Sequence, residues 1–167
     1  MDDARGVALD ALIADHAGAV YRFALSIVRD PSLADDVVQE TMIKAWRAGP
    51  VDDDGTIPRA WLFRVARNTA ISMLRSRRDV VLGPESLPDD SSGPGVSRTV
   101  EGRAAIADLW DALSLLNEDD RALVVLRELD GMSYEEMADL LGMPLTTVKT
   151  RLFRARRVLA RSLEEWR

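Results

Sequence analysis

The segment 133–163 constrains the fold most, because its pattern is that of two helices joined by a tight turn. Ser133 and Glu136 have the spacing of a capping box at a helix start. Gly142 accepts positive φ where the chain must turn, and Pro144 suits the entry to a second helix. A stripe at helical spacing then predicts the apolar face that anchors this second helix: Val148, Leu152, Ala155 and Leu159.

The opposite face of the second helix combines short hydroxyl groups with long cations. Its residues are Thr146, Thr147, Lys149, Thr150, Arg151 and Arg154. Such a helix suits the major groove of DNA, where threonine reaches phosphates or thymine methyl groups and arginine grips guanine. Arg156, Arg157 and Arg161 lie further along and are expected at phosphates. An ordinary helical hairpin is the alternative, but residues 141–163 contain no acidic side chain, which favours DNA binding.

Three helices are predicted before residue 78. The first has an apolar face made of Leu9, Leu12, Ile13, Ala17, Val20, Phe23, Ala24 and Ile27. Ser32 is the expected N-cap of a helix over 33–47, with Asp35 as its capping-box partner. This second helix should bury Val37, Val38, Met42, Ile43 and Trp46. The third, over 59–77, should place on one side Trp61, Leu62, Val65, Ala66, Ala70 and Leu74.

A stretch without periodicity separates these helices from the C-terminal ones. Residues 79–97 are punctuated by glycine, proline and serine, carry acids and no base, and cannot bury enough apolar surface to order themselves. Beyond them, helices are expected over 104–115 and, after a cap at Asn117, over 118–129. The predicted fold is therefore all-α, with two small helical domains, 5–78 and 101–167, joined by a flexible acidic linker over 79–100.

Composition excludes several classes of function. The chain has no cysteine and one histidine, His16, which excludes disulfides, thiolate metal sites and a histidine-based triad. The three aspartates at 52–54 have the charge for Mg²⁺, although adjacent loop acids usually stay hydrated. No phosphate-binding glycine loop is present. We therefore expect no enzymatic activity, catalytic residue, metal, cofactor or small-molecule substrate.

The acidic total, a net charge of −6, does not decide the partners, because the bases are clustered. Residues 61–78 hold no acid but several bases, Arg64, Arg67, Arg75, Arg77 and Arg78. A solvated helix face is the plain alternative for such a cluster. The N-terminus lacks the basic-then-apolar order of a signal peptide, and no apolar run approaches the ~20 residues of a membrane span. A cytoplasmic protein without direct membrane insertion is expected.

Two sets of segments carry motifs in the same order and spacing as one protein family. The C-terminal set is residues 115–121 (LLNEDDR), 129–138 (LDGMSYEEMA) and 148–156 (VKTRLFRAR), and the N-terminal set is residues 35–46 (DDVVQETMIKAW) and 60–70 (AWLFRVARNTA). The C-terminal set resembles region 4 of the extracytoplasmic-function (ECF) sigma factors of the sigma-70 family. The N-terminal set resembles the polymerase-binding and promoter-melting helices of region 2 in the same family. The resemblance implies a transcription initiation factor that binds core RNA polymerase and recognises −35 and −10 promoter elements.

Roles for individual residues follow from the matching motifs together with the chemistry of the helix faces described above. Those expected at the −35 element are Thr146, Thr147, Lys149, Thr150, Arg151, Phe153, Arg154 and Arg157. Those expected at the −10 element are Trp61, Arg64, Arg67, Asn68 and Arg75. Those expected against core polymerase are Asp36, Gln39, Glu40 and Lys44. The loop 48–58 matches the family's position for capturing a flipped base, and the implied partners are core RNA polymerase, promoter DNA and an anti-sigma factor.

The residues themselves leave alternatives open. Trp61 and Phe63 suit stacking on unpaired bases, but large aromatics at helical spacing more often fill cores. Asn68 can read a base edge or be a plain surface residue. The linker can mimic nucleic acid within the polymerase or serve as a passive tether. The rival classes are a two-domain regulator that binds operators without polymerase and an interaction module with no role at DNA.

Overall fold

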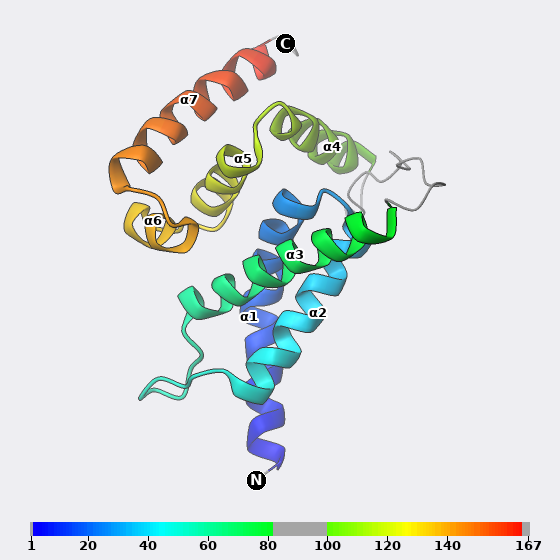
Figure 1. Ribbon diagram of the computed structural model, residues 1–167, viewed down its shortest axis with the longest axis vertical. Helices are drawn as coiled ribbons and strands as arrows, with labels where there is room; N and C mark the ends of the chain where they lie inside the picture. Colours follow the sequence, from blue (N-terminus) through cyan, green and yellow to red (C-terminus); the bar gives the residue numbers. More distant parts are fainter. Residues whose placement is uncertain (1, 82–99, 165–167) are drawn as a thin grey trace. The chain divides into compact units, whose positions relative to one another are not determined.

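The computed structural model describes residues 2–81 and 100–164, and every regular element within those ranges is a helix (Figure 1). The chain divides into two compact units, Met1–Ser91 and Ser92–Arg167. The prediction of an all-α fold is thus confirmed. The predicted linker falls mostly outside the described residues, although its first residues continue a helix that ends at Val81.

The first unit is a bundle of three helices. They are α1 (Asp2–Val28), α2 (Pro31–Ala48) and α3 (Arg59–Val81), and each packs against the other two. At its centre the rings of Phe23 and Phe63 lie 5.4 Å apart between centroids, and both side chains are fully buried. Small residues let the helices approach around this pair: Ala24, Ala34, Ala45, Ala66 and Ala70 are also buried.

The turn between α1 and α2 departs from the prediction. The N-cap of α2 is Asp30, whose Oδ1 accepts hydrogen bonds from the backbone N–H groups of Ser32 and Leu33. The expected cap at Ser32 is therefore wrong. The reason is Pro31, which occupies the first turn, where its missing N–H costs nothing and leaves Asp30 outside the helix.

Helix α1 corrects a second expectation. By length and composition alone, Gly6–Val28 is apolar enough to cross a membrane, with a mean hydropathy of 1.3. The prediction that no run reaches that length is therefore too strict. The core helix of a bundle meets the same criterion, and 44% of the apolar window is buried within the structure. Its inward residues include Leu12, Val20, Phe23, Ala24 and Ile27, as the periodicity predicted.

The second unit contains α4 (Val100–Ser114), α5 (Glu118–Val124), η1 (Val125–Leu129), α6 (Tyr134–Leu141) and α7 (Leu145–Glu164). Asn117 caps α5, as predicted, and η1 continues it as a wider π-helical turn. Arg121 is buried and donates from Nε to the carbonyl of Leu113 and from Nη2 to that of Leu116, which ties the end of α4 to α5. These bonds satisfy carbonyls that a helix end leaves without partners.

The turn between α6 and α7 is the one that the sequence predicts. Ser133 and Glu136 form a complete capping box at the start of α6. Gly142 ends that helix at φ 64°, a left-handed conformation that costs glycine little. The anchoring stripe of α7 is confirmed at Val148, Leu152 and Ala155, which are buried against the rest of the unit, whereas Leu159 is half-buried.

Candidate nucleic-acid interface

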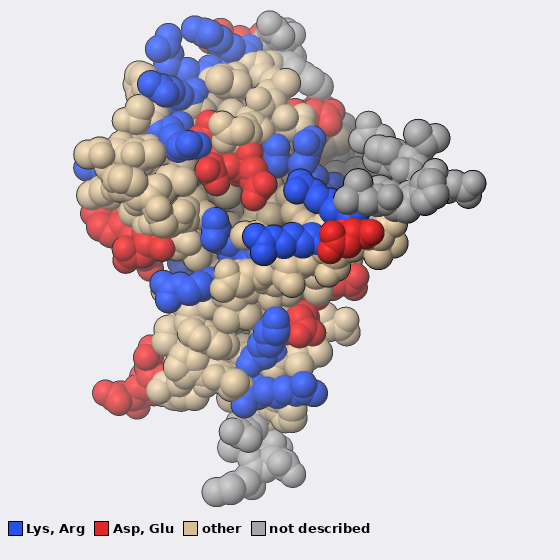
Figure 2. Space-filling model, in the orientation of Figure 1, with Lys and Arg blue, Asp and Glu red and all other residues tan. Residues whose placement is uncertain are grey.

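The outward face of α7 is basic and well exposed. Figure 2 shows Lys and Arg side chains spread along this helix. Lys149, Thr150, Phe153, Arg154 and Arg157 are all exposed, and the ring of Phe153 carries the Arg157 guanidinium 5.8 Å from its centroid. The side chains of Lys149 and Arg154 have no hydrogen bond or ion pair within the described structure. This face can therefore offer free cations to a polyanion without first breaking internal bonds.

Other residues of α7 that the sequence predicts at DNA are partly buried or bonded within the domain. Thr147 is half-buried, and the hydroxyl of Thr150 donates to the carbonyl of Thr146 at 2.9 Å. Arg151 is half-buried and pairs with acids of α5, and Arg156 pairs with Glu128 of η1 through Nε at 2.7 Å. The hydrogen bond from Arg156 to Glu128 raises the pKa of Arg156 above its ordinary value. The cations of this helix thus fall into a free group and a paired group.

Helix α3 presents a second basic face. Basic side chains gather over it in Figure 2. Arg64, Asn68 and Arg75 are exposed, while Trp61 and Arg67 are half-buried. Trp61 is therefore neither a fully buried core residue nor a fully exposed one, and part of its surface stays accessible for the stacking considered from the sequence.

The stacking role considered for Phe63 is wrong. Its side chain has no exposed surface and packs on Phe23 in the bundle core. Helical spacing could have predicted the burial of Phe63. Phe63, Ala66 and Ala70 follow one another at three and four residues and share the buried face.

The loop between α2 and α3 is internally bonded. Thr56 donates from both its backbone N–H and its hydroxyl to Oδ1 of Asp54, and the backbone N–H of Asp52 donates to the carbonyl of Thr56 at 2.8 Å. The bond from the Thr56 hydroxyl holds the pKa of Asp54 below its usual range. No group of three or more acidic or histidine side chains in the part of the chain that the structure describes is arranged to hold a metal ion.

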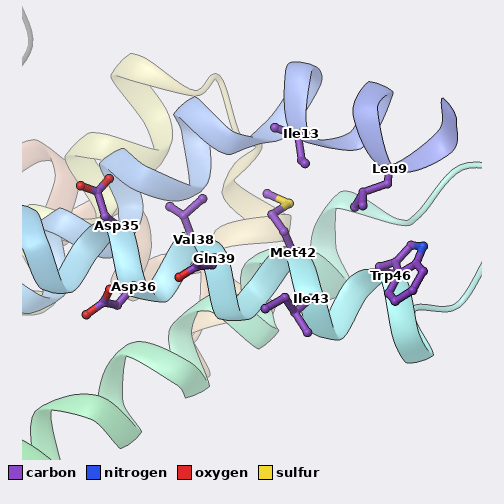
Figure 3. Close-up of a pocket in the computed structure, with 9 residues that line it drawn as sticks. All are labelled: Leu9, Ile13, Asp35, Asp36, Val38, Gln39, Met42, Ile43 and Trp46. Carbon is purple, nitrogen blue, oxygen red and sulfur yellow. The ribbon is translucent and has the colours of Figure 1, made fainter. Parts of the chain in front are cut away.

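The residues expected against polymerase lie in two places on α2. Asp36 and Gln39 line a groove of about 490 Å³ between α1 and α2 (Figure 3). Lys44 instead lies toward α3, with Nζ 3.3 Å from the Thr69 hydroxyl and 3.7 Å from Oε1 of Glu40. Lys44 therefore belongs to the contact between α2 and α3 as well as to the surface, and Glu40 pairs with it along α2.

The groove contains apolar residues that the sequence pattern predicts to be buried. Ile43 and Trp46 are 39% and 47% exposed, and Ile13 of α1 is 41% exposed. The expectation that these side chains face the core is wrong. Val37, Thr41 and Ala45 take the inward positions of α2, so Ile43 and Trp46 fall on the flank that opens into the groove. Exposed large apolar side chains grouped in one groove are typical of a surface that a partner covers.

Comparison with known proteins identifies both units. The model of Sigma-70 region 2 matches residues 12–80, and that of Sigma-70, region 4 matches residues 106–159. The chain is 39% identical over 166 residues to the ECF RNA polymerase sigma factor SigL of Mycobacterium tuberculosis, covering 97% of this chain and 92% of SigL. The chain is an ECF sigma factor of the sigma-70 family. The family assigned from the sequence motifs is thus confirmed.

Other relatives and solved structures agree. This sigma factor is 33% identical over 166 residues to CnrH of Cupriavidus metallidurans, with 94% of this chain and 87% of CnrH covered. Its structure is similar to that of the sigma factor RpoE in complex with the anti-sigma factor NepR from Bartonella quintana, with a TM-score of 0.76, 29% identity and 93% and 96% coverage. It is also similar to CnrH in complex with the cytosolic domain of CnrY, with a TM-score of 0.63, 31% identity and 94% and 88% coverage.

The family decides between the classes that the sequence left open. A regulator that binds operators by itself would need no region 2, whereas both region models match here in the order that sigma factors have. The chain is an RNA polymerase sigma factor, a transcription initiation factor that takes part in DNA-templated transcription. The interpretation as an operator-binding regulator is therefore disfavoured.

Proposed function

We propose that this sigma factor grips a promoter at two points while it is bound to core RNA polymerase. A region 4 domain over 101–167 holds the −35 element with α7. A region 2 domain over 5–78 holds the −10 element with α3 and docks on the polymerase with α2. The linker over 79–100 lets the two domains span the distance between the elements. The polymerase supplies the chemistry of RNA synthesis, and this chain supplies recognition and strand opening.

One observation carries the proposal: each family-matched unit has a helix that bears exposed cations without a bonded partner in the described ranges. Lys149 and Arg154 on α7, and Arg64 and Arg75 on α3, are exposed and have no bonded partner among the described side chains. Each free cation that meets a phosphate releases counterions, which favours binding. The acids that make the chain negative overall do not pair with these four residues within the described ranges.

The two helices have different chemistry beside their cations. Around α7, Thr146, Thr147 and Thr150 offer small contacts near the helix start, and exposed Phe153 with Arg157 offers an apolar surface to a thymine methyl group. On α3, exposed Asn68 has a donor and an acceptor for a base edge, and half-buried Trp61 offers part of an indole for stacking. Arg67 adds charge beside them. The first set suits duplex DNA and the second suits separated strands.

Docking on core polymerase is assigned to the outer side of α2. Asp36 and Gln39 place polar groups beside the exposed Ile43 and Trp46 in one groove. A charged rim around an apolar centre is the usual arrangement of a protein interface. Glu40 and Lys44 extend this surface toward α3.

We also propose that the chain acts in the cytoplasm and is held inactive by an anti-sigma factor. RpoE and CnrH, to which its structure is similar, are complexed with NepR and with the cytosolic domain of CnrY. Core polymerase and promoter DNA, its other proposed partners, are reached from the same compartment.

Run-off transcription with core polymerase and a library of promoter-length duplexes tests the function. We expect specific products only when this chain is present, and their templates should share two sequence blocks. The variant with both Lys149→Ala and Arg154→Ala serves as the matched control and should lose most of the product. Absence of any specific product across the library would falsify the proposal.

A further inference from the structure

Arg151 lies on the recognition helix but is directed toward its own domain. Its Nη1 is 3.1 Å from Oδ1 of Asp120 and 3.7 Å from Oδ2 of Asp119, both in the first turn of α5. Only 35% of the Arg151 side chain is exposed, and only 18% of that of Asp120. The neighbouring cations Lys149 and Arg154 are exposed and have no such partner within the described residues.

Asp120, the acceptor of this ion pair, is held in place by hydrogen bonds that do not involve Arg151. Asp120 donates its backbone N–H to Oδ1 of Asn117, and Nδ2 of Asn117 donates to Oδ2 of Asp120 at 3.0 Å. One carboxylate oxygen of Asp120 is thus occupied by the cap of α5, and the other is occupied by Arg151. A carboxylate fixed in this way offers a guanidinium one position rather than many.

A second pair joins α7 to the other end of the same helical segment. Arg156 binds Oε1 of Glu128 in η1 through Nε at 2.7 Å. Both side chains are nearly half exposed, so this pair contributes little stability by itself. Together the two pairs attach α7 at both ends of the continuous α5–η1 segment, and α7 packs against α5.

We infer that Arg151 and Asp120 form a positioning pair, which fixes how α7 presents Lys149, Thr150 and Arg154 to the −35 element, and that Arg151 does not itself contact the DNA. The inference deepens the proposed function and rests on it. It also replaces the −35 contact assigned to Arg151 from the sequence motif. For Arg151 to reach a phosphate it would have to leave Asp119 and Asp120 uncompensated. Repulsion between these two carboxylates and the phosphate backbone would then offset the attraction of the guanidinium to the phosphate.

The two possible roles of Arg151 predict opposite effects on DNA binding when Asp120 is substituted. If Asp120 only competes with DNA for Arg151, then Asp120→Asn frees the arginine, removes a negative charge and strengthens binding. If Asp120 positions Arg151, the same change weakens binding, because α7 loses its fixed orientation. Asn has nearly the shape of Asp and can still bond to Asn117, so the cap of α5 survives the substitution.

The test measures promoter affinity of the holoenzyme against salt concentration, with a duplex selected by the wild-type protein. We expect Arg151→Gln and Asp120→Asn each to weaken binding roughly threefold to tenfold, and the double variant to weaken it no further, since the two residues act as a unit. Neither should change the slope of log K against log salt. Lys149→Gln should make that slope less steep by the amount expected for the loss of about one phosphate contact. Arg151→Lys, which keeps the charge, should restore much of the affinity.

Several outcomes would overturn the inference. One is a smaller salt slope for Arg151→Gln, and another is tighter binding for Asp120→Asn. A third is affinity that falls only in step with the folded fraction measured by circular dichroism, because the pair would then be merely structural. If Lys149→Gln and Arg154→Gln also left affinity and slope unchanged, the −35 assignment of α7 itself would fail, and the inference with it.

Discussion

Asp30 and Arg77 lie 47 residues apart in the sequence, yet Oδ2 of Asp30 accepts a hydrogen bond from Nη1 of Arg77. The other oxygen of the same carboxylate caps α2. One side chain therefore starts α2 and attaches the far part of α3 to the turn after α1. The hydrogen bond from Arg77 is the main reason that the pKa of Asp30 is below its ordinary value, and the cap bonds lower it further.

Two substitutions at Asp30 separate these roles. Asparagine caps a helix as well as aspartate does, so Asp30→Asn should cost only the ion pair, about 0.2–1 kcal/mol of the free energy of unfolding. Asp30→Ala should cost about 1 kcal/mol more, because the cap is lost as well. Urea denaturation of the full chain at pH 7 measures both. Equal losses for the two variants would show that the ion pair alone matters.

The ion pair also predicts a pH dependence. A carboxyl group with a lowered folded-state pKa contributes stability above its unfolded pKa, about 3.9, and loses it as pH falls through the folded value. The difference in unfolding free energy between the wild type and Asp30→Asn should therefore persist from pH 7 to about pH 5 and shrink below about pH 4. A difference that stayed constant down to pH 3 would contradict the role given to the charge.

Arg29, next to Asp30, has φ 56° and is the one residue other than glycine with positive φ in the described ranges. This conformation costs an L-residue about 1–2 kcal/mol, part of which glycine gives back through its greater freedom in the unfolded chain. Arg29→Gly should therefore stabilise the first unit by about 0.5–1 kcal/mol in urea denaturation. Arg29→Ala is the control, because it removes the charge and keeps the strain, and it should bring no such stabilisation.

The free cations of α7 predict a separation of two binding steps. Lys149→Ala and Arg154→Ala should each weaken use of the −35 element, with Arg154→Ala also relaxing base preference if it grips guanine, at a cost of about 1–3 kcal/mol. Affinity for core polymerase, measured without DNA, should be unchanged. An equal loss of core association would place these residues in the polymerase interface instead.

The groove of α2 predicts that charge position matters on that helix. Asp36→Lys should weaken binding to core polymerase by about tenfold, as reversal of an interface charge commonly does. Asp10→Lys makes the same change of charge at an exposed position of α1 that does not line the groove. It should leave the affinity within about twofold, since distant exposed charges are screened by salt. Fluorescence anisotropy with labelled sigma factor measures both, and equal losses would mean that only net charge matters.

Helical periodicity predicted the helices and most of their inward faces, because spacing of three and four residues is a local property. It does not distinguish a core face from an apolar surface that a partner covers, which is why it predicts burial for Ile43 and Trp46 although both are exposed. Periodicity also does not reveal the pairing of Arg151 with Asp120, since the two residues lie 31 residues apart and the motif gives Arg151 an outward position. The N-cap at Asp30 can be predicted from the sequence, because a proline directly after it marks the first turn of the helix.

The two glycines that end α2 and α6, Gly49 and Gly142, should tolerate different sets of substitutions. At Gly142 nothing lies within 4 Å of a Cβ position, so only the left-handed backbone limits the residue, and asparagine or aspartate should be tolerated next best. At Gly49 a Cβ would lie 2.5 Å from the carbonyl oxygen of Ala45, so every larger residue meets backbone. A saturation library selected for folding should therefore recover a short family of residues at Gly142 and glycine alone at Gly49.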